Sequence, residues 1–324
     1  MAVDFHLELN PTGFHHKIKY GDQIFLIGSC FTSHLYERFH AHKFNAFQNS
    51  HGILFNPISI LNALNDCIDL KSVNEDELFM HQSLWHHWDF HSHFSHEHKA
   101  MAISGMNQQI KDAHKFLKHA NWLFITLGSA FVYDHQEKGI VANCHKIPAD
   151  QFNRYLLDPN ELKDLYNHFL LRLKAFNPDI NVVLTVSPVR HLRDGLIENN
   201  RSKAVLLHAI DLICKVNPTV FYFPSYELII DDLRDYRFYA EDMVHPNYLA
   251  TQYVWEKFVS SCIEGKTQEA MKEVNQLLQA VKHRPLHPQS QDHLKFRQKF
   301  HLIAKELAKR FPSLDFSAEI EYFS

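Results

Sequence analysis

The chain has 324 residues, of which 45% are hydrophobic and 22% are charged, and its formal net charge at pH 7 is −4. A chain of this length can bury a large core, and it fits one α/β domain of roughly 250 residues with a smaller appendage better than two equal domains. The lack of any Lys/Arg block excludes a basic surface for nucleic acid or anionic membranes, and no apolar run is long enough to span a bilayer.

The N-terminal sequence and the cysteines predict a cytoplasmic protein. The sequence MAVDFHLELN lacks the basic start and apolar run of a secretory signal, although a signal peptide removed earlier would leave the same pattern. The odd number of cysteines and the absence of a CxxC pair favour reduced thiols over a disulfide framework. The cysteines are Cys30, Cys67, Cys144, Cys214 and Cys262.

Four short apolar runs predict buried parallel strands, because they are rich in β-branched and aromatic residues and show no polar alternation. They span Gln23–Ile27, Trp122–Thr126, Asn181–Val186 and Val220–Phe223. Apolar residues at helical spacing lie between these runs, before Trp122 and again over residues 162–176. This alternation predicts an α/β fold in three layers, with helices on both faces of a parallel sheet.

Two further segments stand apart from this alternation. A Lys138-Gly139 turn between Phe131–Tyr133 and Ile140–Val141 predicts a β-hairpin after the second predicted strand. After residue 264, two amphipathic helical faces are joined by a Pro/His linker over residues 283–290. We therefore expect a main domain over residues 1–263, with a His-rich insertion at about 80–100, and a C-terminal helical extension over 264–324.

Ser29 is the first candidate catalytic residue. It follows the first predicted strand and Gly28, and a helix is predicted to begin within a few residues. Reactive groups in open α/β sheets gather at the carboxyl ends of strands, and helix N-terminal N–H groups stabilise developing negative charge. The alternative interpretation is that Ser29 only caps the helix.

Asp242 and His245 are the second and third candidates. An Asp three residues before a His can reach its Nδ1, which leaves Nε2 to accept a proton from a serine. The pair follows the last predicted strand and precedes a helix that Asn247 can cap. Another rim segment, Thr126 to Ala130, places Gly128 and Ser129 directly after a strand, where an oxyanion hole or a plain glycine turn is expected.

These motifs together resemble one family. The order GSCFT (28–32), then TLGS (126–129), then Asp242-x-x-His245 resembles the GSCFA-domain proteins of the SGNH/GDSL hydrolase group. Further segments of the resemblance are Asn56–Ser59, His91–Phe94 and Val186–Leu206, so it covers most of residues 20–260. The resemblance implies a flavodoxin-like sheet, Ser29 as nucleophile, and Asp242 and His245 as its partners. We predict no cofactor.

The chain departs from the broader hydrolase pattern at two positions. Gly-Asp-Ser is replaced by GSC at residues 28–30, and the usual third-block asparagine is replaced by Ser129. Asn56 and Asn200 are the candidates for the missing side-chain oxyanion donor. The backbone N–H of Ser29, with that of Gly52 or Gly128, is expected to complete the oxyanion hole.

The resulting prediction is a serine esterase that acts on a small-molecule ester, with an O-acylated or O-acetylated carbohydrate as the favoured class. The acyl group would pass through Ser29 to water, and transfer to another hydroxyl is equally compatible with the triad. Cys30 is a further candidate nucleophile, although it is expected to point into the helix packing. The oligomeric state is left open.

Two other functions remain open. Seven histidines between residues 81 and 98 are compatible with a metal site or with a surface insertion, and no metal-binding spacing motif accompanies them. Because WDFHSHFS (88–95) matches the family pattern, His91 and Ser92 are predicted to line the substrate pocket. Arg190 belongs to the run VRHLR (189–193), whose cations suit either a substrate carboxylate or sulfate or a solvated edge. A non-catalytic binding protein on the same fold is the last alternative.

Overall fold

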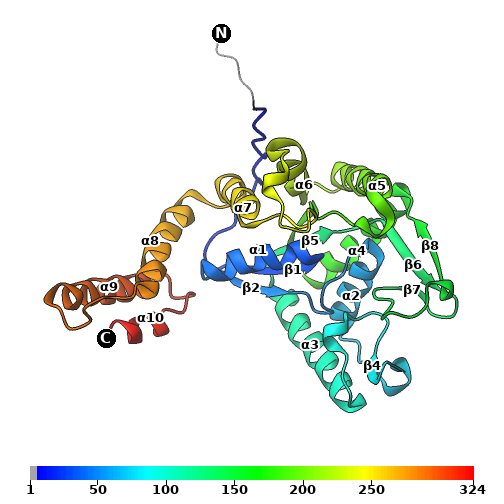
Figure 1. Cartoon of the computed structure of the whole chain (residues 1–324), viewed down its shortest axis with the longest axis horizontal. Coiled ribbons are helices and arrows are strands. Elements are labelled where there is room, and N and C mark those ends of the chain that lie inside the picture. Colours follow the sequence, from blue (N-terminus) through cyan, green and yellow to red (C-terminus); the bar gives the residue numbers. More distant parts are fainter. Residues whose placement is uncertain (1–5) are drawn as a thin grey trace, which may run out of the picture.

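A five-stranded parallel sheet forms the centre of the molecule (Figure 1). The computed structural model describes residues 6–324, apart from the side chain of Asp194. The strands lie in the order β10-β9-β5-β1-β2, and every neighbouring pair is parallel. Their bounds are β1 Gln23–Gly28, β2 Asn45–Gln48, β5 Trp122–Leu127, β9 Asn181–Val186 and β10 Val220–Tyr222.

The strand order is that of flavodoxin-like folds. Numbered along the chain, these five strands lie side by side as 2-1-3-4-5, so the direction of winding reverses between β1 and β5. In open α/β sheets, ligands bind outside the carboxyl ends of the strands at this reversal. The residues that follow β1 and β5 therefore occupy the position where a functional site is expected.

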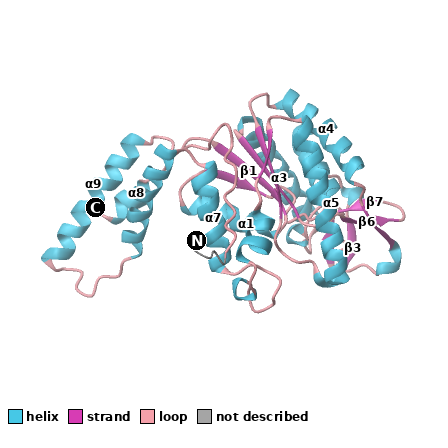
Figure 2. Cartoon of the chain, turned by 90° about the horizontal axis from the view of Figure 1, so that it is seen from above, coloured by secondary structure: helices cyan, strands magenta, loops and turns pink. Residues whose placement is uncertain are grey.

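Helices cover both faces of the sheet (Figure 2), as predicted. Successive strand residues point to opposite faces, so Ile24 and Leu26 pack on one side while Phe25 and Ile27 pack on the other. The first side is covered by α1 (Cys30–Ala41) and α7 (Tyr248–Cys262). The second is covered by α2 (Pro57–Asp69), α3 (Lys99–His119), α4 (Pro159–Phe176) and α5 (Gly195–Val216).

Four of the five strands coincide with the apolar runs, and β2 was not predicted. The sequence of β2, NAFQ, is short and has no apolar run, and none of its residues is fully buried. It lies at the edge of the sheet and pairs only with β1. An edge strand needs less apolar surface than a central one, which explains why its sequence carries a weak signal.

Two small sheets extend from the main domain. The predicted hairpin is present as β6 (Phe131–His135) and β7 (Gly139–Val141), and β8 (Phe152–Leu156) adds a third strand on the other side of β6. In the His-rich segment, β3 (Phe79–His81) pairs with β4 (Leu84–His86). The remaining short helical turns are η1 Glu75–Glu77, η2 Ser92–Phe94, η3 Ala149–Gln151, η4 Leu192–Asp194, α6 Ser225–Glu227, η5 Leu228–Leu233 and η6 Tyr236–Phe238.

The C-terminal region is helical, as predicted, and extends away from the sheet (Figure 1). It consists of α8 (Gly265–Lys282), α9 (Gln291–Arg310) and α10 (Ser317–Tyr322). These helices share an apolar core of their own, while Met271 of α8 packs in the core on the α1/α7 side of the sheet. Within residues 6–324, no helix has the length and apolar composition needed to cross a bilayer.

Candidate active site

Ser29 follows β1 at a turn that requires glycine at the preceding position. Gly28 has φ +138°, and a Cβ at this position would lie 2.1 Å from the carbonyl oxygen of Thr126. The end of β1 therefore contacts the end of β5 backbone to backbone, and the chain turns directly into α1. This turn fixes Ser29 at the edge of the sheet where the strand order reverses.

The Ser29 hydroxyl is not used as a helix cap. Ser29 occupies the N-cap position of α1, but its side chain makes no capping hydrogen bond. Its Oγ is buried and has no hydrogen-bond partner among residues 6–324. Because an unpaired buried hydroxyl costs about 1–3 kcal/mol, a capping role does not account for this serine.

Asp242 and His245 form the contact that their spacing predicts. One carboxylate oxygen of Asp242 lies 2.6 Å from Nδ1 of His245, and the other accepts the N–H groups of Val244 and His245 at 2.9 and 3.0 Å. These hydrogen bonds, that from the His245 N–H foremost, lower the pKa of Asp242 to about 2. The carboxylate thus stays ionised and orients the imidazole, with Nε2 directed away from it.

The His245 loop lies near two other segments of the site. His245 is within electrostatic range of His34 on α1 and of His191 after β9. Burial lowers the pKa of His191 to about 4, and the charges of Lys203 and His245 act in the same direction. His245 and the Ser29 hydroxyl are not hydrogen bonded, because Ser29 Oγ has no partner in the described part of the chain.

Arg190 holds the His245 loop. Its backbone N–H donates to the carbonyl oxygen of Val244 at 3.4 Å, and its guanidinium donates to that of Met243 at 3.2 Å. The guanidinium also lies over the ring of Tyr239, 4.2 Å from its centroid. Arg190 is thus engaged with protein groups, and it does not line either cavity described below.

The backbone N–H groups expected in the oxyanion hole are not free in this structure. The N–H of Ser29 donates to Thr126 O at 3.1 Å, that of Gly52 to Asn49 O at 2.8 Å, and that of Gly128 to Phe55 O at 2.9 Å. The first bond joins the ends of β1 and β5, the second closes a turn, and the third joins the end of β5 to the loop before α2. Their use as oxyanion donors therefore requires a local rearrangement.

The expected side-chain donors are not placed to hold an oxyanion, because Asn56 is engaged and Asn200 lies outside both cavities. Asn56 caps α2, with its Oδ1 2.8 Å from the N–H of Ser59 and its Nδ2 2.9 Å from the Ser59 hydroxyl. Asn200 is exposed on α5 and lies outside both cavities. Ser129 Oγ accepts the N–H of Phe131 at 3.1 Å and lies 3.2 Å from Ser202 Oγ. The Asn56 bonds form a local helix N-cap, whereas the contact between Ser129 and Ser202 joins segments distant in sequence and could not be predicted from spacing.

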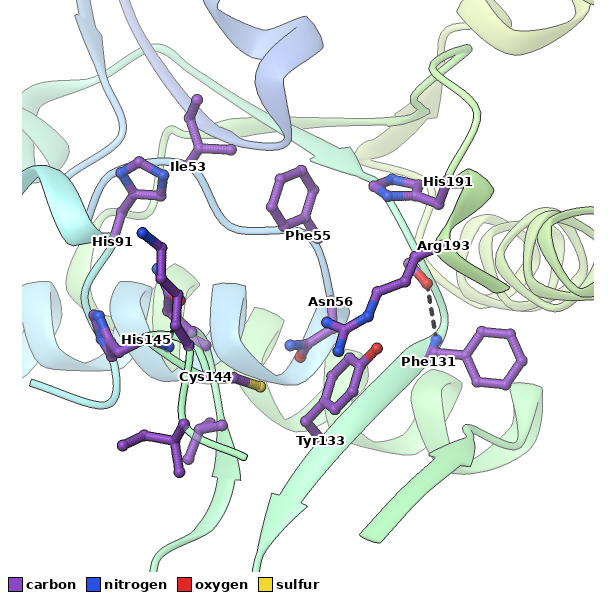
Figure 3. Close-up of a pocket in the computed structure, with 16 residues that line it drawn as sticks. Ile53, Phe55, Asn56, His91, Phe131, Tyr133, Cys144, His145, His191 and Arg193 are labelled. Carbon is purple, nitrogen blue, oxygen red and sulfur yellow. Dashed lines mark hydrogen bonds between the residues drawn. The ribbon is translucent and has the colours of Figure 1, made fainter. Parts of the chain in front are cut away.

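Two adjoining cavities lie beside the strand ends, and Figure 3 shows the first of them. Each has a volume of about 500 Å³, and the two share Ile53 and His91. Gly52 lines the second cavity, and a Cβ there would lie 2.4 Å from that of His91. Of the residues predicted for the site, Asn56, His91 and Ser129 line the first cavity, which we call the Arg193 cavity. Its other polar lining residues are Tyr133, Asn143, Cys144, His145, Lys146, His191 and Arg193. Ser29, Asp242 and His245 are not among the described residues that line either cavity.

Two protein-family models together match nearly the whole chain. The GSCFA family matches residues 23–258, and the C-terminal domain of GSCFA domain proteins matches residues 274–324. The chain belongs to the GSCFA family. This membership agrees with the resemblance carried by the GSCFT, TLGS and Asp-x-x-His motifs.

Solved structures resemble this GSCFA protein only weakly. A Streptococcus pneumonia protein named for platelet activating factor has 10% identity and a TM-score of 0.40, covering 76% of this chain and 86% of its own. An acetyl xylan esterase from Butyrivibrio proteoclasticus has 11% identity and a TM-score of 0.41, covering 74% and 63%. An α/β hydrolase from the metagenome of Lake Arreo, Spain, has 11% identity and a TM-score of 0.38, covering 76% and 99%. Similarity at this level says nothing about the activity of this chain. No curated protein matches the sequence significantly.

Lys203 is a residue of this GSCFA site that the sequence analysis missed. Its ammonium nitrogen is buried beneath the strand ends and lies 2.7 Å from the carbonyl oxygens of both Gly128 and Ser187. Burial lowers the pKa of Lys203 to about 7, with partial compensation from Cys30. The sequence does contain a signal that Lys203 is buried. It lies at helical spacing from Asn199 and Leu206, and all three residues are on the buried face of α5.

Several histidines of the His-rich segment take part in hydrogen bonds through their rings. His86 Nδ1 lies 2.6 Å from the Ser95 hydroxyl, and its Nε2 lies 3.1 Å from a backbone carbonyl oxygen. His145 joins this segment, with Nε2 2.9 Å from His87 O and Nδ1 3.3 Å from Ser92 Oγ. Among the described residues, no group of three or more His, Cys, Asp or Glu side chains is arranged to hold a metal ion. Ser92 thus supports the cavity wall through His145 and does not line the cavity.

Proposed function

We propose that this GSCFA protein is a serine hydrolase of the SGNH type that cleaves esters through an acyl-serine intermediate. The observation that carries the proposal is the state of Ser29, which has a buried and unpaired hydroxyl at the end of β1. Folding leaves such a group unsatisfied at a cost, and a catalytic role is one physical reason for its retention. The Asp242–His245 pair near the same end of the sheet supplies an oriented base.

In the proposed reaction, Nε2 of His245 accepts the Ser29 proton while Oγ forms a bond to the ester carbonyl carbon. The protonated imidazole then donates this proton to the leaving alkoxide oxygen as the carbon–oxygen bond breaks. Water then attacks the acyl carbon while His245 accepts its proton, and the imidazolium returns that proton to Ser29 Oγ as the bond between the acyl carbon and Oγ breaks and the acid leaves. The ionised carboxylate of Asp242 stabilises the imidazolium that forms in each half-reaction.

In the proposed reaction, the His245 loop or the residues that cover Ser29 must move so that Nε2 of His245 can reach the Ser29 hydroxyl. Ser29 is buried, whereas the side chains of Asp242 and His245 are half exposed. Catalytic hydrogen bonds are often long or misaligned without substrate and shorten in the substrate complex. Met243, with φ +56°, lies between the two loop residues and is a position where the backbone can change conformation.

We further propose that the substrate is an O-acylated carbohydrate and that the protein is cytoplasmic. Polar side chains and aromatic rings line the Arg193 cavity together, which suits a molecule with both hydroxyl groups and an apolar face. Transfer of the acyl group to an alcohol differs from hydrolysis only in the second acceptor. An acceptor alcohol added to the assay distinguishes the two through formation of a new ester.

The engaged N–H groups favour a second candidate, a binding protein without catalysis. The N–H groups of Ser29, Gly52 and Gly128 all donate to backbone carbonyl oxygens, so no preformed backbone oxyanion hole exists at these positions. Loss of oxyanion stabilisation costs a factor of about 10²–10³ in kcat for a single donor. A protein with this arrangement could retain substrate binding alone.

Labelling by a fluorophosphonate and hydrolysis of short-chain nitrophenyl esters separate the two candidates. We expect the wild-type protein to be labelled at Ser29 and to release nitrophenol. Ser29→Ala and His245→Ala should each lower kcat by roughly a thousandfold, since the triad acts as a unit. The binding-protein candidate predicts no labelling and no turnover by any variant.

Two controls keep the outcome specific. Ser72→Ala removes an exposed serine outside the site and should change neither labelling nor turnover. Cys30→Ala tests the other possible nucleophile, whose pKa is raised by burial and which is therefore a poor thiolate. Full activity of Ser29→Ala, or loss of activity in Cys30→Ala alone, would remove Ser29 from the mechanism.

A further inference from the structure

The Arg193 cavity carries positive charge without a matching acidic lining. Its described lining residues include Arg193 and Lys146 and no aspartate or glutamate. Neither cation forms an ion pair with another residue in the described part of the chain, although the protein as a whole has a formal net charge of −4. A cavity with two unpaired cations in an overall acidic protein is electrostatically complementary to an anion.

The two arginines of the run 189–193 have different environments. Arg190 is bound to the His245 loop and to tyrosine rings, as described above. Arg193 instead extends into the cavity beside Asn56 and Tyr133 (Figure 3), with its guanidinium carbon 5.4 Å from the Tyr133 ring centroid. Its N–H groups make no hydrogen bond to another described residue, so they are available to a ligand.

Lys146 reaches the cavity through an unusual turn. Ile147 N–H donates to Cys144 O at 2.9 Å, and the two central residues, His145 and Lys146, have φ +47° and +62°. L-residues rarely adopt this conformation, and two in succession persist only where other contacts impose it. The buried His145 ring supplies these contacts through His87 O and Ser92 Oγ.

The histidines of the cavity are neutral at pH 7. Burial is the main cause that lowers the pKa of both His145 and His191 to about 4, and it also lowers the pKa of His91. The positive charge of the cavity therefore comes from Arg193 and Lys146 alone. His191 contributes a buried Nε2 without a hydrogen-bond partner among residues 6–324, which can bond a polar ligand atom.

We propose that the Arg193 cavity binds the carboxylate of an acidic, sugar-sized alcohol whose ester is the substrate of Ser29. The inference rests on the proposed function for the role of Ser29, whereas the carboxylate site rests on Arg193 and Lys146. The planar guanidinium of Arg193 can hold a carboxylate through two parallel hydrogen bonds, with Lys146 as a second positive charge. The neighbouring Phe55, Phe131 and Tyr133 provide an apolar wall for the body of the ligand.

Calorimetric titration of Ser29→Ala protein tests the carboxylate site without hydrolysis. The probes are O-acetylated methyl glucuronoside and O-acetylated methyl glucoside, which differ only in a carboxylate in place of a hydroxymethyl group. We expect the glucuronoside to bind at least about tenfold more tightly, as one charge-assisted bidentate contact allows. Arg193→Gln and Lys146→Gln, each combined with Ser29→Ala, should remove most of this preference. Lys138→Gln, an equal charge change in the β6–β7 turn outside the cavity, should retain it.

The outcomes separate this inference from the proposed function. Tight glucuronoside binding with no hydrolysis by the wild-type protein would overturn the hydrolase and leave the carboxylate site supported. Equal or undetectable binding of the two probes, or a preference unchanged in both cavity variants, would overturn the carboxylate site even if esters are hydrolysed. Tighter binding of methyl glucoside 6-sulfate than of the glucuronoside would overturn the carboxylate as the anion.

Discussion

The ammonium group of Lys203 donates a hydrogen bond to the carbonyl oxygen of Gly128, and the two atoms are 2.7 Å apart. A second bond of the same length reaches Ser187, so one side chain from α5 joins the residues that follow β5 and β9. The Gly128 N–H meanwhile donates to Phe55 O. Lys203 therefore holds together the loops that follow β5 and β9. Its contribution to the free energy of unfolding can be measured by substitution.

Lys203→Met should lower the free energy of unfolding by about 2–4 kcal/mol, because two buried carbonyl oxygens lose their donor. Urea denaturation followed by circular dichroism measures the change. Lys215→Met is the control, since Lys215 is exposed and pairs only with Asp211 on the same helix, and it should cost less than about 0.5 kcal/mol. Equal effects of the two substitutions would show that the Lys203 bonds contribute nothing to stability.

The same lysine should make stability depend on alkaline pH. Burial lowers the pKa of Lys203 from 10.5 to about 7, so between these values the unfolded chain binds more protons than the folded chain. The Lys203 contribution to the free energy of unfolding therefore rises as pH increases from 7 toward 10.5, and its full penalty applies below pH 7.

Buried thiols oppose this trend, since burial raises the pKa of Cys67 and Cys262 to about 12 and their ionisation in the unfolded chain destabilises the fold at high pH. The informative quantity is thus the difference between wild type and Lys203→Met, measured by urea denaturation at pH 7 and pH 9. We expect the loss caused by the substitution to be larger at pH 9. A difference that is constant or shrinks would show that Lys203 is charged throughout this range.

The fold was predictable because each central strand is a continuous apolar run. Trp122–Leu127 is buried at every position, and such a run has few alternatives to a strand covered on both faces. The edge strand β2 lacks that signal, since its stability comes from pairing with β1. Because β2 is not predicted from its own sequence, the order of the strands could be predicted only from the family resemblance.

The Asp242–His245 contact was predictable for a different reason, namely that its determinants are local. Asp242 and His245 lie three residues apart, and Ser29 is marked by the glycine before it and the helix after it. The Lys203 bonds and the Arg193 cavity join segments distant in sequence, and no spacing rule brings Arg193 and Lys146 together. The engaged state of the expected oxyanion donors is likewise a property of the folded backbone.

Gly28→Ala should prevent stable folding or cost at least about 3 kcal/mol, because the new Cβ would meet Thr126 O at 2.1 Å and the residue has φ +138°. Gly105→Ala is the control, since a Cβ at this exposed position of α3 has nothing within 4 Å. It should stabilise the helix by about 0.5–1 kcal/mol. Thermal unfolding midpoints measure both effects, and a tolerated Gly28→Ala would contradict the close approach of β1 and β5.

Asp242→Asn should lower kcat by roughly 10³–10⁴, because an amide can neither stabilise the imidazolium nor hold the productive tautomer. The pKa of Asp242, about 2, keeps the carboxylate ionised throughout the assay range, so protonation of Asp242 should not contribute to loss of activity above about pH 4. Asp235→Asn makes the same charge change in a neighbouring exposed turn and should leave kcat unchanged. Initial rates with nitrophenyl acetate decide the matter, and equal rates for both variants would exclude the carboxylate from catalysis.

Ser29→Ala should separate activity from stability. The Ser29 hydroxyl is buried and has no hydrogen-bond partner within residues 6–324, so its removal should leave the free energy of unfolding unchanged or raise it by about 1 kcal/mol. Ser202→Ala provides the contrast, since Ser202 Oγ accepts the Ala130 N–H at 2.7 Å and its loss leaves a buried donor unpaired, at a cost of about 1–3 kcal/mol. Urea denaturation of both variants, alongside fluorophosphonate labelling, gives the two readouts. A Ser29→Ala protein that is destabilised as much as Ser202→Ala would show that the serine has a structural bond, and the argument for a retained catalytic hydroxyl would then fail.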